Sequence, residues 1–131
     1  MSRLQLAAIG ISVAGIAISV YLTVLHYAGV APACVTSGPV NCEAVLSSPY
    51  AVVAGSSIPT SALGIAWFGA SAVLWALPRG WIQLAWSTAG LLTVVYLVYI
   101  EIVLVGAICL WCTAAHVLVV ALLLIAVSTR K

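Results

Sequence analysis

The clearest shortage in this 131-residue chain is charge. Four Lys or Arg and two acidic residues make up 5% of the sequence, whereas 66% of the residues are hydrophobic. The mean hydropathy is +1.32. Soluble globular domains carry about 25% charged residues, so this composition excludes one and indicates an integral membrane protein. The formal net charge of +2 is also too small to suggest a nucleic-acid-binding protein.

Long polar stretches are also scarce, and the apolar runs set the number of membrane spans. A helix needs about 20 residues to cross the hydrocarbon core, so the chain has room for four spans and one modest loop. We predict a single all-α membrane domain over residues 1–131, a bundle of four transmembrane helices with a long external loop at residues 28–58. The expected spans are residues 4–27, 59–77, 81–104 and 108–127.

Helix-breaking residues separate the last three spans. Pro78 and Gly80 end the second span, since neither residue continues a helix well. The apolar stretch that follows would form a helix of roughly 70 Å, which is too long for one crossing. The sequence VGA at residues 105–107 is its expected break.

A signal peptide is the alternative interpretation of the first apolar run. Arg3 precedes that run, and APAC at residues 31–34 faintly resembles a cleavage site. The run is about twice as long as the apolar core of a signal peptide. We therefore expect it to remain as a membrane span.

The four basic residues predict the orientation. Arg3 precedes the first span, Arg79 lies between the second and third, and Arg130 and Lys131 follow the fourth. Four spans place all of them on one face, and loops rich in Lys and Arg stay in the cytoplasm. We expect an inner (cytoplasmic) membrane protein with both termini in the cytoplasm and all four cysteines near the external face.

The four cysteines form two pairs of different kinds. Cys34 and Cys42 lie in the loop with seven residues between them, among them a Gly-Pro pair that favours a turn. A structural disulfide and a redox role are equally open for this pair. Cys109 and Cys112 share one face at the start of a helix, where free N–H groups favour the reactive thiolate. A C-x-x-C disulfide closes too small a loop to stabilise a fold strongly, so this pair indicates redox chemistry.

A zinc site is another specific interpretation of these residues. Cys109, Cys112 and His116 lie on one helix face, and the loop cysteines would complete a tetrahedral centre. A fixed zinc ion would immobilise the loop that a thiol relay needs to move. We therefore predict a redox site with no metal.

Three further polar residues are candidates for a role near the cysteines. Glu101 lies near the outer end of the third span, where an acid is a functional candidate unless it is solvated. His116 lies one turn after Cys112 and is a candidate contact for a ligand, although a lone His also serves as a packing residue. His26, near the outer end of the first span, is a weaker candidate of the same kind.

The remaining unusual residues have simpler structural explanations. The five Trp residues fit interfacial anchoring or bundle packing better than a cofactor site. Small residues in membrane helices allow neighbouring helices to approach closely. The glycines expected at such contacts are Gly10, Gly15, Gly64 and Gly69.

Taken together, these features resemble the vitamin K epoxide reductase family over nearly the whole chain. The matching elements are four spans, C-x7-C in the loop after the first span, a Ser six residues after its second Cys within CEAVLSSPYA, and C-x-x-C opening the fourth span. The order of these elements is more specific than any one of them. The resemblance implies a bundle that holds a quinone, of the ubiquinone, menaquinone or vitamin K type, beneath a loop with a short horizontal helix.

The resemblance also implies a role for each cysteine. Cys34 and Cys42 would be a relay pair, Cys109 would exchange with Cys42, and Cys112 would face the quinone. Ser48 would donate a hydrogen bond to a quinone oxygen. These roles describe thiol–disulfide exchange in series between a protein dithiol and a quinone.

Two departures from the family pattern affect the expected ligands and partner. His116 stands where vertebrate members carry a Tyr four residues after the second active-site Cys, so His116, with Glu101, is a candidate quinone contact. Bacterial members are often fused to a thioredoxin-like domain, whereas the sequence here ends at Lys131. We expect a separate soluble thioredoxin-fold, DsbA-like oxidant as partner.

The expected function is a membrane oxidoreductase that oxidises this partner and passes the electrons to a quinone. One alternative is vitamin K epoxide or quinone reduction as the main activity. Another is a non-enzymatic membrane scaffold with structural disulfides. A second bacterial disulfide-generating family also has four spans and two cysteine pairs, but its C-x-x-C lies in the first external loop and its wider pair in the second. Because the order is reversed here, we set that identification aside.

Overall fold

The chain folds into helices joined by short turns and one long loop. The computed structural model describes residues 1–34, 36–78 and 80–130, and these ranges contain isolated bridges but no β-strand. The all-α membrane fold expected from the sequence is confirmed. In chain order the elements are α1 (Arg3–Ala28), α2 (Cys42–Leu46), η1 (Pro49–Ala51), η2 (Val53–Gly55), α3 (Thr60–Ala76), α4 (Trp81–Tyr99), the π-helix η3 (Ile100–Val105) and α5 (Leu110–Ser128).

The predicted spans fall on the long helices. α1, α5 and the continuous helix made by α4 and η3 are long and apolar enough to cross a membrane. α3 is shorter, and its 17 residues make a length of about 26 Å. The ends of these helices differ from the expected ranges by at most two residues. The short helix expected within the loop corresponds to α2.

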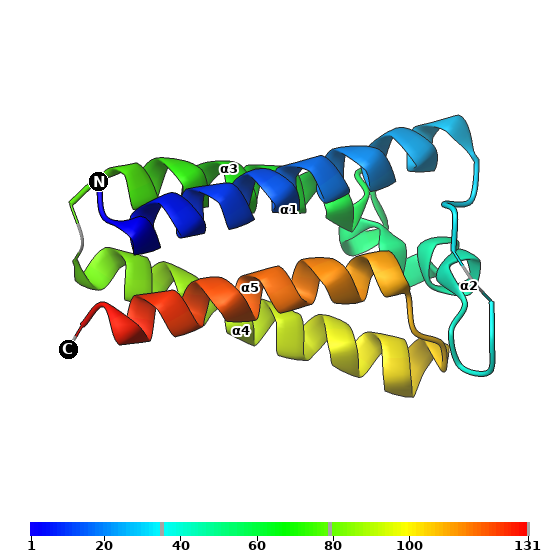
Figure 1. The fold of residues 1–131 in the computed structure, drawn as a ribbon. Helices are drawn as coiled ribbons and strands as arrows, with labels where there is room; N and C mark the ends of the chain where they lie inside the picture. The colour runs from blue at the N-terminus through cyan, green and yellow to red at the C-terminus, as the bar shows by residue number, and fades with distance from the viewer. Residues whose placement is uncertain (35, 79, 131) are drawn as a thin grey trace.

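The helices form an elongated bundle whose two ends differ. α1 packs beside α3 and also contacts α5, and α4 packs beside α5. Both chain termini lie at one end, whereas α2 and the long loop lie at the other (Figure 1). We call the latter the cysteine end. Arg79 and Lys131, two of the basic residues behind the predicted orientation, lie outside the described residues, so the orientation stays a prediction.

Capping residues explain where the helices begin and end. Gln5 N donates to Ser2 Oγ at 3.2 Å and Ser2 N donates to Gln5 Oε1 at 3.0 Å, which together form a capping box at the start of α1. Gly29 and Gly106 end α1 and η3 with φ values of 68° and 75°. Glycine adopts these left-handed values without strain. η3 thus ends at Val105, at the start of the segment 105–107 where the sequence placed the break.

Gln83 holds the turn between α3 and α4. Its amide nitrogen donates to the carbonyl oxygens of Leu74 and Pro78 at 2.8 and 3.2 Å, and its side-chain oxygen accepts from Gly80 N at 2.8 Å. The side chain is buried, with 2% of its surface exposed. It therefore satisfies backbone groups that a tight turn leaves without partners.

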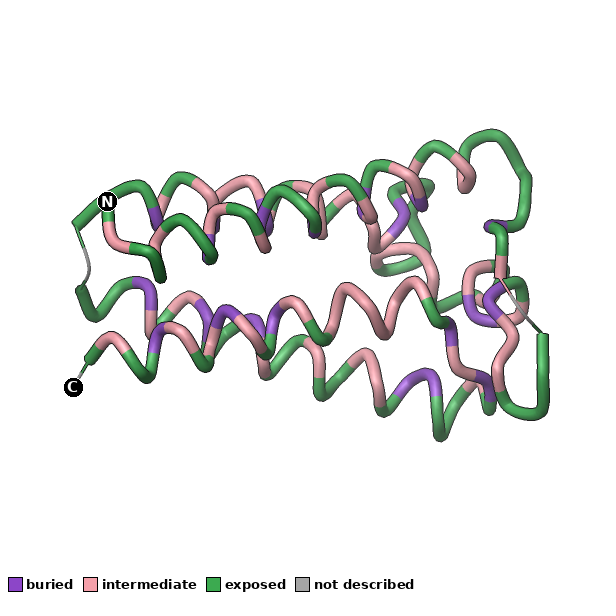
Figure 2. The backbone as a smooth tube through the Cα atoms, viewed as in Figure 1, coloured by how far each residue is buried: buried purple, intermediate pink, exposed green. Residues whose placement is uncertain are grey.

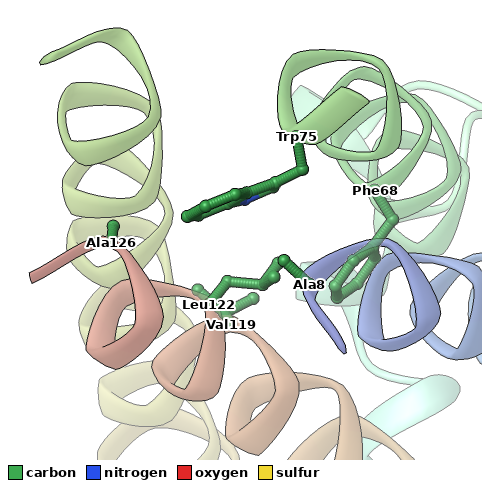
Figure 3. Close-up of a cluster of buried hydrophobic side chains, with 6 residues drawn as sticks. All are labelled: Ala8, Phe68, Trp75, Val119, Leu122 and Ala126. Atoms are coloured by element: carbon green, nitrogen blue, oxygen red, sulfur yellow. The ribbon is translucent and has the colours of Figure 1, made fainter. Parts of the chain in front are cut away.

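The apolar core lies where the helices face one another. Figure 2 shows buried residues along the inner sides of the helices and exposed residues on their outer sides. The ring of Trp75 reaches from α3 toward Val119 and Leu122 of α5, and Phe68 packs against α1 (Figure 3). Outward-facing residues are also large and apolar, for example Leu124, which is 64% exposed. Such an outer surface suits a lipid environment.

Two of the four glycines expected at close helix contacts lie at such contacts. A Cβ on Gly15 would overlap the ring of Phe68, and one on Gly64 would lie 2.6 Å from Ser19 Oγ. The prediction is wrong for Gly10 and Gly69, because a Cβ there would meet nothing within 4 Å. Glycine spacing alone does not reveal which face of a helix meets a neighbour. Gly90, which lies against Trp67, was missed for the same reason.

Candidate functional site

The long loop is fastened to the turn between η3 and α5. Asn41 N donates to Ile108 O at 2.9 Å, and Ile108 N donates to Pro39 O at 2.8 Å. These bonds form a parallel bridge between Val40 and Ile108. The bridge places the start of α2 directly beside the segment that carries Cys109.

Two further contacts hold the cysteine-bearing loop in place. Asn41 caps α2, because its side-chain oxygen accepts from Ala44 N at 3.0 Å. The indole N–H of Trp111 donates to Ala33 O at 2.8 Å, and its ring lies 4.8 Å from that of Tyr21. Trp111 thus ties α5 to α1 and to the residue before Cys34, which is a more specific role than the anchoring or packing expected of it.

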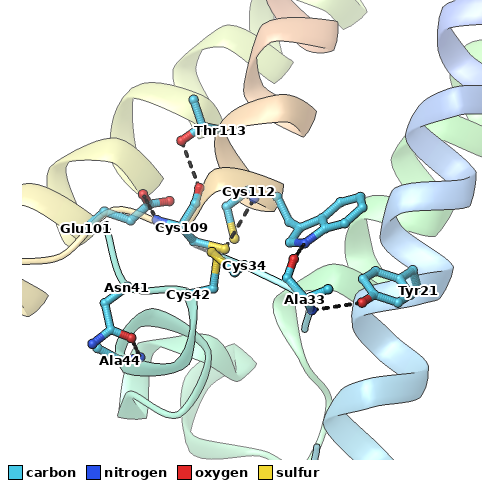
Figure 4. Close-up of a disulfide and its surroundings, with 11 residues drawn as sticks. Tyr21, Ala33, Cys34, Asn41, Cys42, Ala44, Glu101, Cys109, Cys112 and Thr113 are labelled. Atoms are coloured by element: carbon cyan, nitrogen blue, oxygen red, sulfur yellow. Dashed lines mark hydrogen bonds between the residues drawn. A yellow bond between two sulfur atoms is a disulfide. The ribbon is translucent and has the colours of Figure 1, made fainter. Parts of the chain in front are cut away.

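All four cysteines meet at the cysteine end. Cys34 and Cys42 form a disulfide, and Cys109 and Cys112 are thiols. Cys42 and Cys109 belong to one buried cluster, against which Cys34 and Cys112 pack. Figure 4 shows the two thiols beside the disulfide. Spacing alone left the loop pair open between several roles, whereas the fold brings the two pairs into contact.

Cys109 is the N-cap of α5, and its sulfur takes part in the cap. Its Sγ accepts from Cys112 N at 3.4 Å, and Thr113 Oγ1 donates to Cys109 O at 2.8 Å. A hydrogen bond from the Cys112 thiol lowers the pKa of Cys109, against the opposing effects of burial and of the charge of Glu101. This arrangement favours a thiolate on Cys109.

Glu101 reaches back to the start of α5. Its Oε2 accepts from Cys109 N at 3.3 Å, and its side chain is 6% exposed. Its backbone oxygen also accepts from Gly106 N at 2.8 Å and Ala107 N at 3.0 Å. The sequence left open whether this acid is a solvated helix end. The structure places it inside the protein, at the cysteine site.

A cavity of about 710 Å³ opens next to this cluster and reaches into the bundle. Its wall is mostly apolar, with contributions from α1, α2, α3, α4, η3 and α5. Among the cysteines, Cys112 lines it and Cys34, Cys42 and Cys109 do not. The other sequence-predicted candidates that line it are Ser48, Glu101, His116 and His26.

The predicted polar contacts differ in their freedom to bind a ligand. The Ser48 hydroxyl donates to Val45 O at 2.7 Å, so its hydrogen already has a partner within the protein. His116 is half-buried, and its ring makes no hydrogen bond within the described part of the chain. His116 is therefore the readier group to contact a ligand in the cavity.

Several cavity residues were not identified from the sequence. Trp67 forms part of the wall and stacks on Trp86 with ring centroids 5.6 Å apart. Tyr50 and Glu43 line the cavity from the loop, and Thr93 from α4. These residues come from different elements, so no local pattern marks them as a group.

The zinc alternative lacks a ligand set within residues 1–34, 36–78 and 80–130. No three His, Cys, Asp or Glu side chains there lie close enough to hold a metal ion. The two loop cysteines, which that centre needed, are bonded to each other.

The comparison with known proteins agrees with this architecture. The model of the vitamin K epoxide reductase family matches residues 6–127, which is most of the chain. No curated protein is similar enough in sequence to be matched. Proteins of this family carry out redox chemistry of disulfides and quinones in membranes. The resemblance seen in the sequence is confirmed, and the chain belongs to the vitamin K epoxide reductase family of membrane oxidoreductases.

Proposed function

We propose that this oxidoreductase oxidises a separate soluble protein of the thioredoxin fold and passes the electrons to a quinone. The observation that carries the proposal is the position of Cys112. This thiol lines the apolar cavity, while Cys109 packs in the same buried cluster as Cys42 of the loop disulfide. Cys109 therefore adjoins the loop disulfide and Cys112 adjoins the cavity, which supports electron transfer in that order.

The cavity suits a quinone in size and polarity. Small-molecule sites have volumes of about 300–1,000 Å³, and this cavity has about 710 Å³. Its apolar wall matches a lipid-soluble ring and tail, and His116 and Ser48 would contact the ring oxygens. Ser48 would first have to turn its hydroxyl hydrogen away from Val45 O. A quinone, when bound, supplies a two-electron acceptor.

The redox states in the structure match one stage of such a relay. The loop pair is oxidised and the inner pair is reduced. A thiolate of the partner attacks the loop disulfide, so that one S–S bond breaks and a mixed disulfide forms. Resolution of that bond leaves an oxidised partner and a loop dithiol. The loop dithiol then reduces the Cys109–Cys112 disulfide and recovers its own S–S bond.

The loop sulfur that receives the partner is Cys34. Cys34 is half-buried, whereas Cys42 is 2% exposed. Exchange requires access to the sulfur under attack. In the Cys42→Ala variant we expect a mixed disulfide between Cys34 and the partner to accumulate. Capture of the partner on Cys109 instead, with the loop cysteines dispensable, would make the loop disulfide structural.

The decisive experiment measures electron transfer from the inner pair to a quinone. The full chain is placed in quinone-free phosphatidylcholine nanodiscs, reduced, and mixed with a ubiquinone or menaquinone analogue. We expect loss of quinone absorbance together with formation of the Cys109–Cys112 disulfide, and neither change in the Cys112→Ala variant. An inner pair that stays oxidised and is indifferent to quinone would favour a scaffold with structural disulfides.

A matched pair of Trp variants tests the cavity as the quinone site. Ala115 lines the cavity, so Ala115→Trp should fill it and raise the quinone concentration needed for half-maximal rate by about tenfold. Leu124 points outward from the same helix and is 64% exposed, so Leu124→Trp should leave that concentration unchanged. Equal effects of the two substitutions would place the quinone elsewhere.

A further inference from the structure

Two acidic groups share the N-terminal end of α5. The Cys109 sulfur accepts from Cys112 N at 3.4 Å, and Glu101 Oε2 accepts from Cys109 N at 3.3 Å. Both N–H groups lie at the helix start, where the helix dipole stabilises negative charge. The same helix end therefore supports a thiolate on Cys109 or a carboxylate on Glu101.

Burial prevents both groups from being charged together. Cys109 has no exposed surface and Glu101 is 6% exposed. Like charges at close range in a poorly solvated site repel strongly, so one of them takes up a proton. In the described part of the chain no basic side chain pairs with Glu101, and its polar contact is the Cys109 N–H. The site thus holds one negative charge.

We propose that Glu101 carries a proton while the Cys109–Cys112 pair is reduced and releases it when the pair becomes a disulfide. In the reduced state the negative charge is on Cys109, Cys112 is a thiol and Glu101 is a neutral carboxylic acid. Oxidation removes the thiolate, and the charge then passes to Glu101. The proton of Glu101 is released at the wall of the cavity, which both Glu101 and Cys112 line.

Oxidation of the Cys109–Cys112 pair by this route balances in bonds, electrons and protons, and the one outside reactant it needs is an electron acceptor. The Cys112 S–H bond and the Glu101 O–H bond break, and the S–S bond forms. Two electrons leave for a disulfide or quinone acceptor, and two protons are released. The net charge of the three side chains is the same before and after, so no uncompensated charge is created in the apolar interior.

Several other titratable groups share the cavity with Glu101 in the described residues. They are His116 and Cys112 of α5, Glu43 of α2, His26 of α1 and Tyr50 of η1. Tyr99 lies just before η3 and is 51% exposed. Cys42 of α2 is held in the disulfide. Glu43 is exposed and is the second carboxyl side chain of the sequence, which makes it a matched control.

The test is the pH dependence of the redox equilibrium of the inner pair against dithiothreitol, without quinone. Full-length protein in quinone-free nanodiscs is equilibrated with the dithiothreitol couple, alkylated, and mapped so that each cysteine pair is quantified separately. Dithiothreitol also gains two protons on reduction, so the exchange constant of the wild-type protein should not change with pH. In Glu101→Gln, reduction of the pair takes up one proton, whereas in the wild type it takes up two. The exchange constant of this variant should therefore shift toward the reduced protein by about tenfold for each unit by which the pH is raised.

The controls make every outcome decisive. Gln keeps an oxygen that accepts from Cys109 N. Glu43→Gln also removes a carboxyl from the cavity wall, but in this quinone-free measurement its exchange constant should stay independent of pH. A pH-independent constant in Glu101→Gln would overturn the proposal, as would a tenfold change per pH unit in the wild type. If Glu101→Gln does not fold, redox-induced infrared difference spectra of the wild type and Glu43→Gln still decide. Both should show a protonated carboxyl band on reduction, and its absence would refute the assignment.

Discussion

Cys109 acquires its chemistry from groups of two residues, Cys112 of α5 and Glu101 of η3. The Cys112 N–H and the hydrogen bond from the Cys112 thiol stabilise its thiolate, and the Glu101 carboxyl binds its backbone N–H. Cys112 differs, because it lies one turn further along and faces the cavity. The two thiols of one C-x-x-C are therefore suited to different partners, Cys109 to a sulfur and Cys112 to a ligand.

Removal of Cys112 should trap the exchange between the two pairs. In the Cys112→Ala variant Cys109 has no resolving thiol, and it belongs to the same buried cluster as Cys42. We expect a stable Cys42–Cys109 disulfide, detected by peptide mapping without reduction. The Cys109→Ala variant is the control and should lack it. Finding only the Cys34–Cys42 disulfide in Cys112→Ala would contradict the relay.

A pair of glycine substitutions in α1 tests the close contact between α1 and α3. In Gly15→Ala the new methyl group would overlap the buried ring of Phe68, so we expect a loss of about 1–3 kcal/mol in the free energy of unfolding in detergent. Gly10→Ala has open space around it and should be neutral or stabilise α1 by about 0.5–1 kcal/mol. Equal stabilities of the two variants would show that α1 and α3 pack less closely at Gly15 than they do in the structure.

At the scale of elements, the π-helix η3 decides where Glu101 lies. In a π-helix the backbone bonds span one residue more than in an α-helix, and such turns are frequent at functional sites. Here Gly106 N donates to Glu101 O, five residues earlier. The wider turn ends at Gly106 and returns the chain toward α5. The carboxyl of Glu101 thereby accepts from the backbone N–H of Cys109, the N-cap of α5.

The turn between α3 and α4 depends on one buried amide. Replacing Gln83 by Leu removes the bonds to Leu74 O, Pro78 O and Gly80 N, which together hold the turn. We expect a loss of about 1–3 kcal/mol in the free energy of unfolding, measured by thermal unfolding in detergent. Gln83→Glu keeps an acceptor for Gly80 N but loses both donor bonds, so a stability equal to that of the wild type would contradict the role of those bonds.

At the scale of the whole molecule, the bundle separates its termini from its redox site. Both termini lie at one end and the four cysteines at the other (Figure 1). Under the proposed function, a soluble partner would approach the cysteine end and a quinone would enter the cavity from the membrane.

The orientation of this bundle is a testable prediction. The basic residues favour cytoplasmic termini, so a Cys introduced as Ser57→Cys at the cysteine end should react with a membrane-impermeant maleimide added outside intact cells. A Cys introduced as Gly80→Cys, next to Arg79, should react only after the membrane is permeabilised. Both variants are made with the four native cysteines replaced by Ala. Labelling of Gly80→Cys from outside would reverse the predicted topology.

Much of the fold could be predicted because hydrophobicity and helix-breaking residues are local signals. Four apolar runs, the Pro-Arg-Gly turn and Gly106 locate the helices to within two residues. The glycine contacts were only partly predictable, because the sequence of a helix does not show which of its faces contacts another helix. Gly10 and Gly15 lie in the same apolar helix, yet only Gly15 lies against Phe68.

For the site, the sequence by itself determined the membrane class, the two cysteine pairs, and a thiolate-favouring position for Cys109. Only the tertiary structure decided that Cys42 packs with Cys109, that Cys112 alone of the cysteines lines the cavity, and that Glu101 is buried against the Cys109 N–H. The reason is physical. Helix formation and reactivity at a helix end depend on neighbours in the chain, whereas burial and sulfur contacts depend on how separate elements pack.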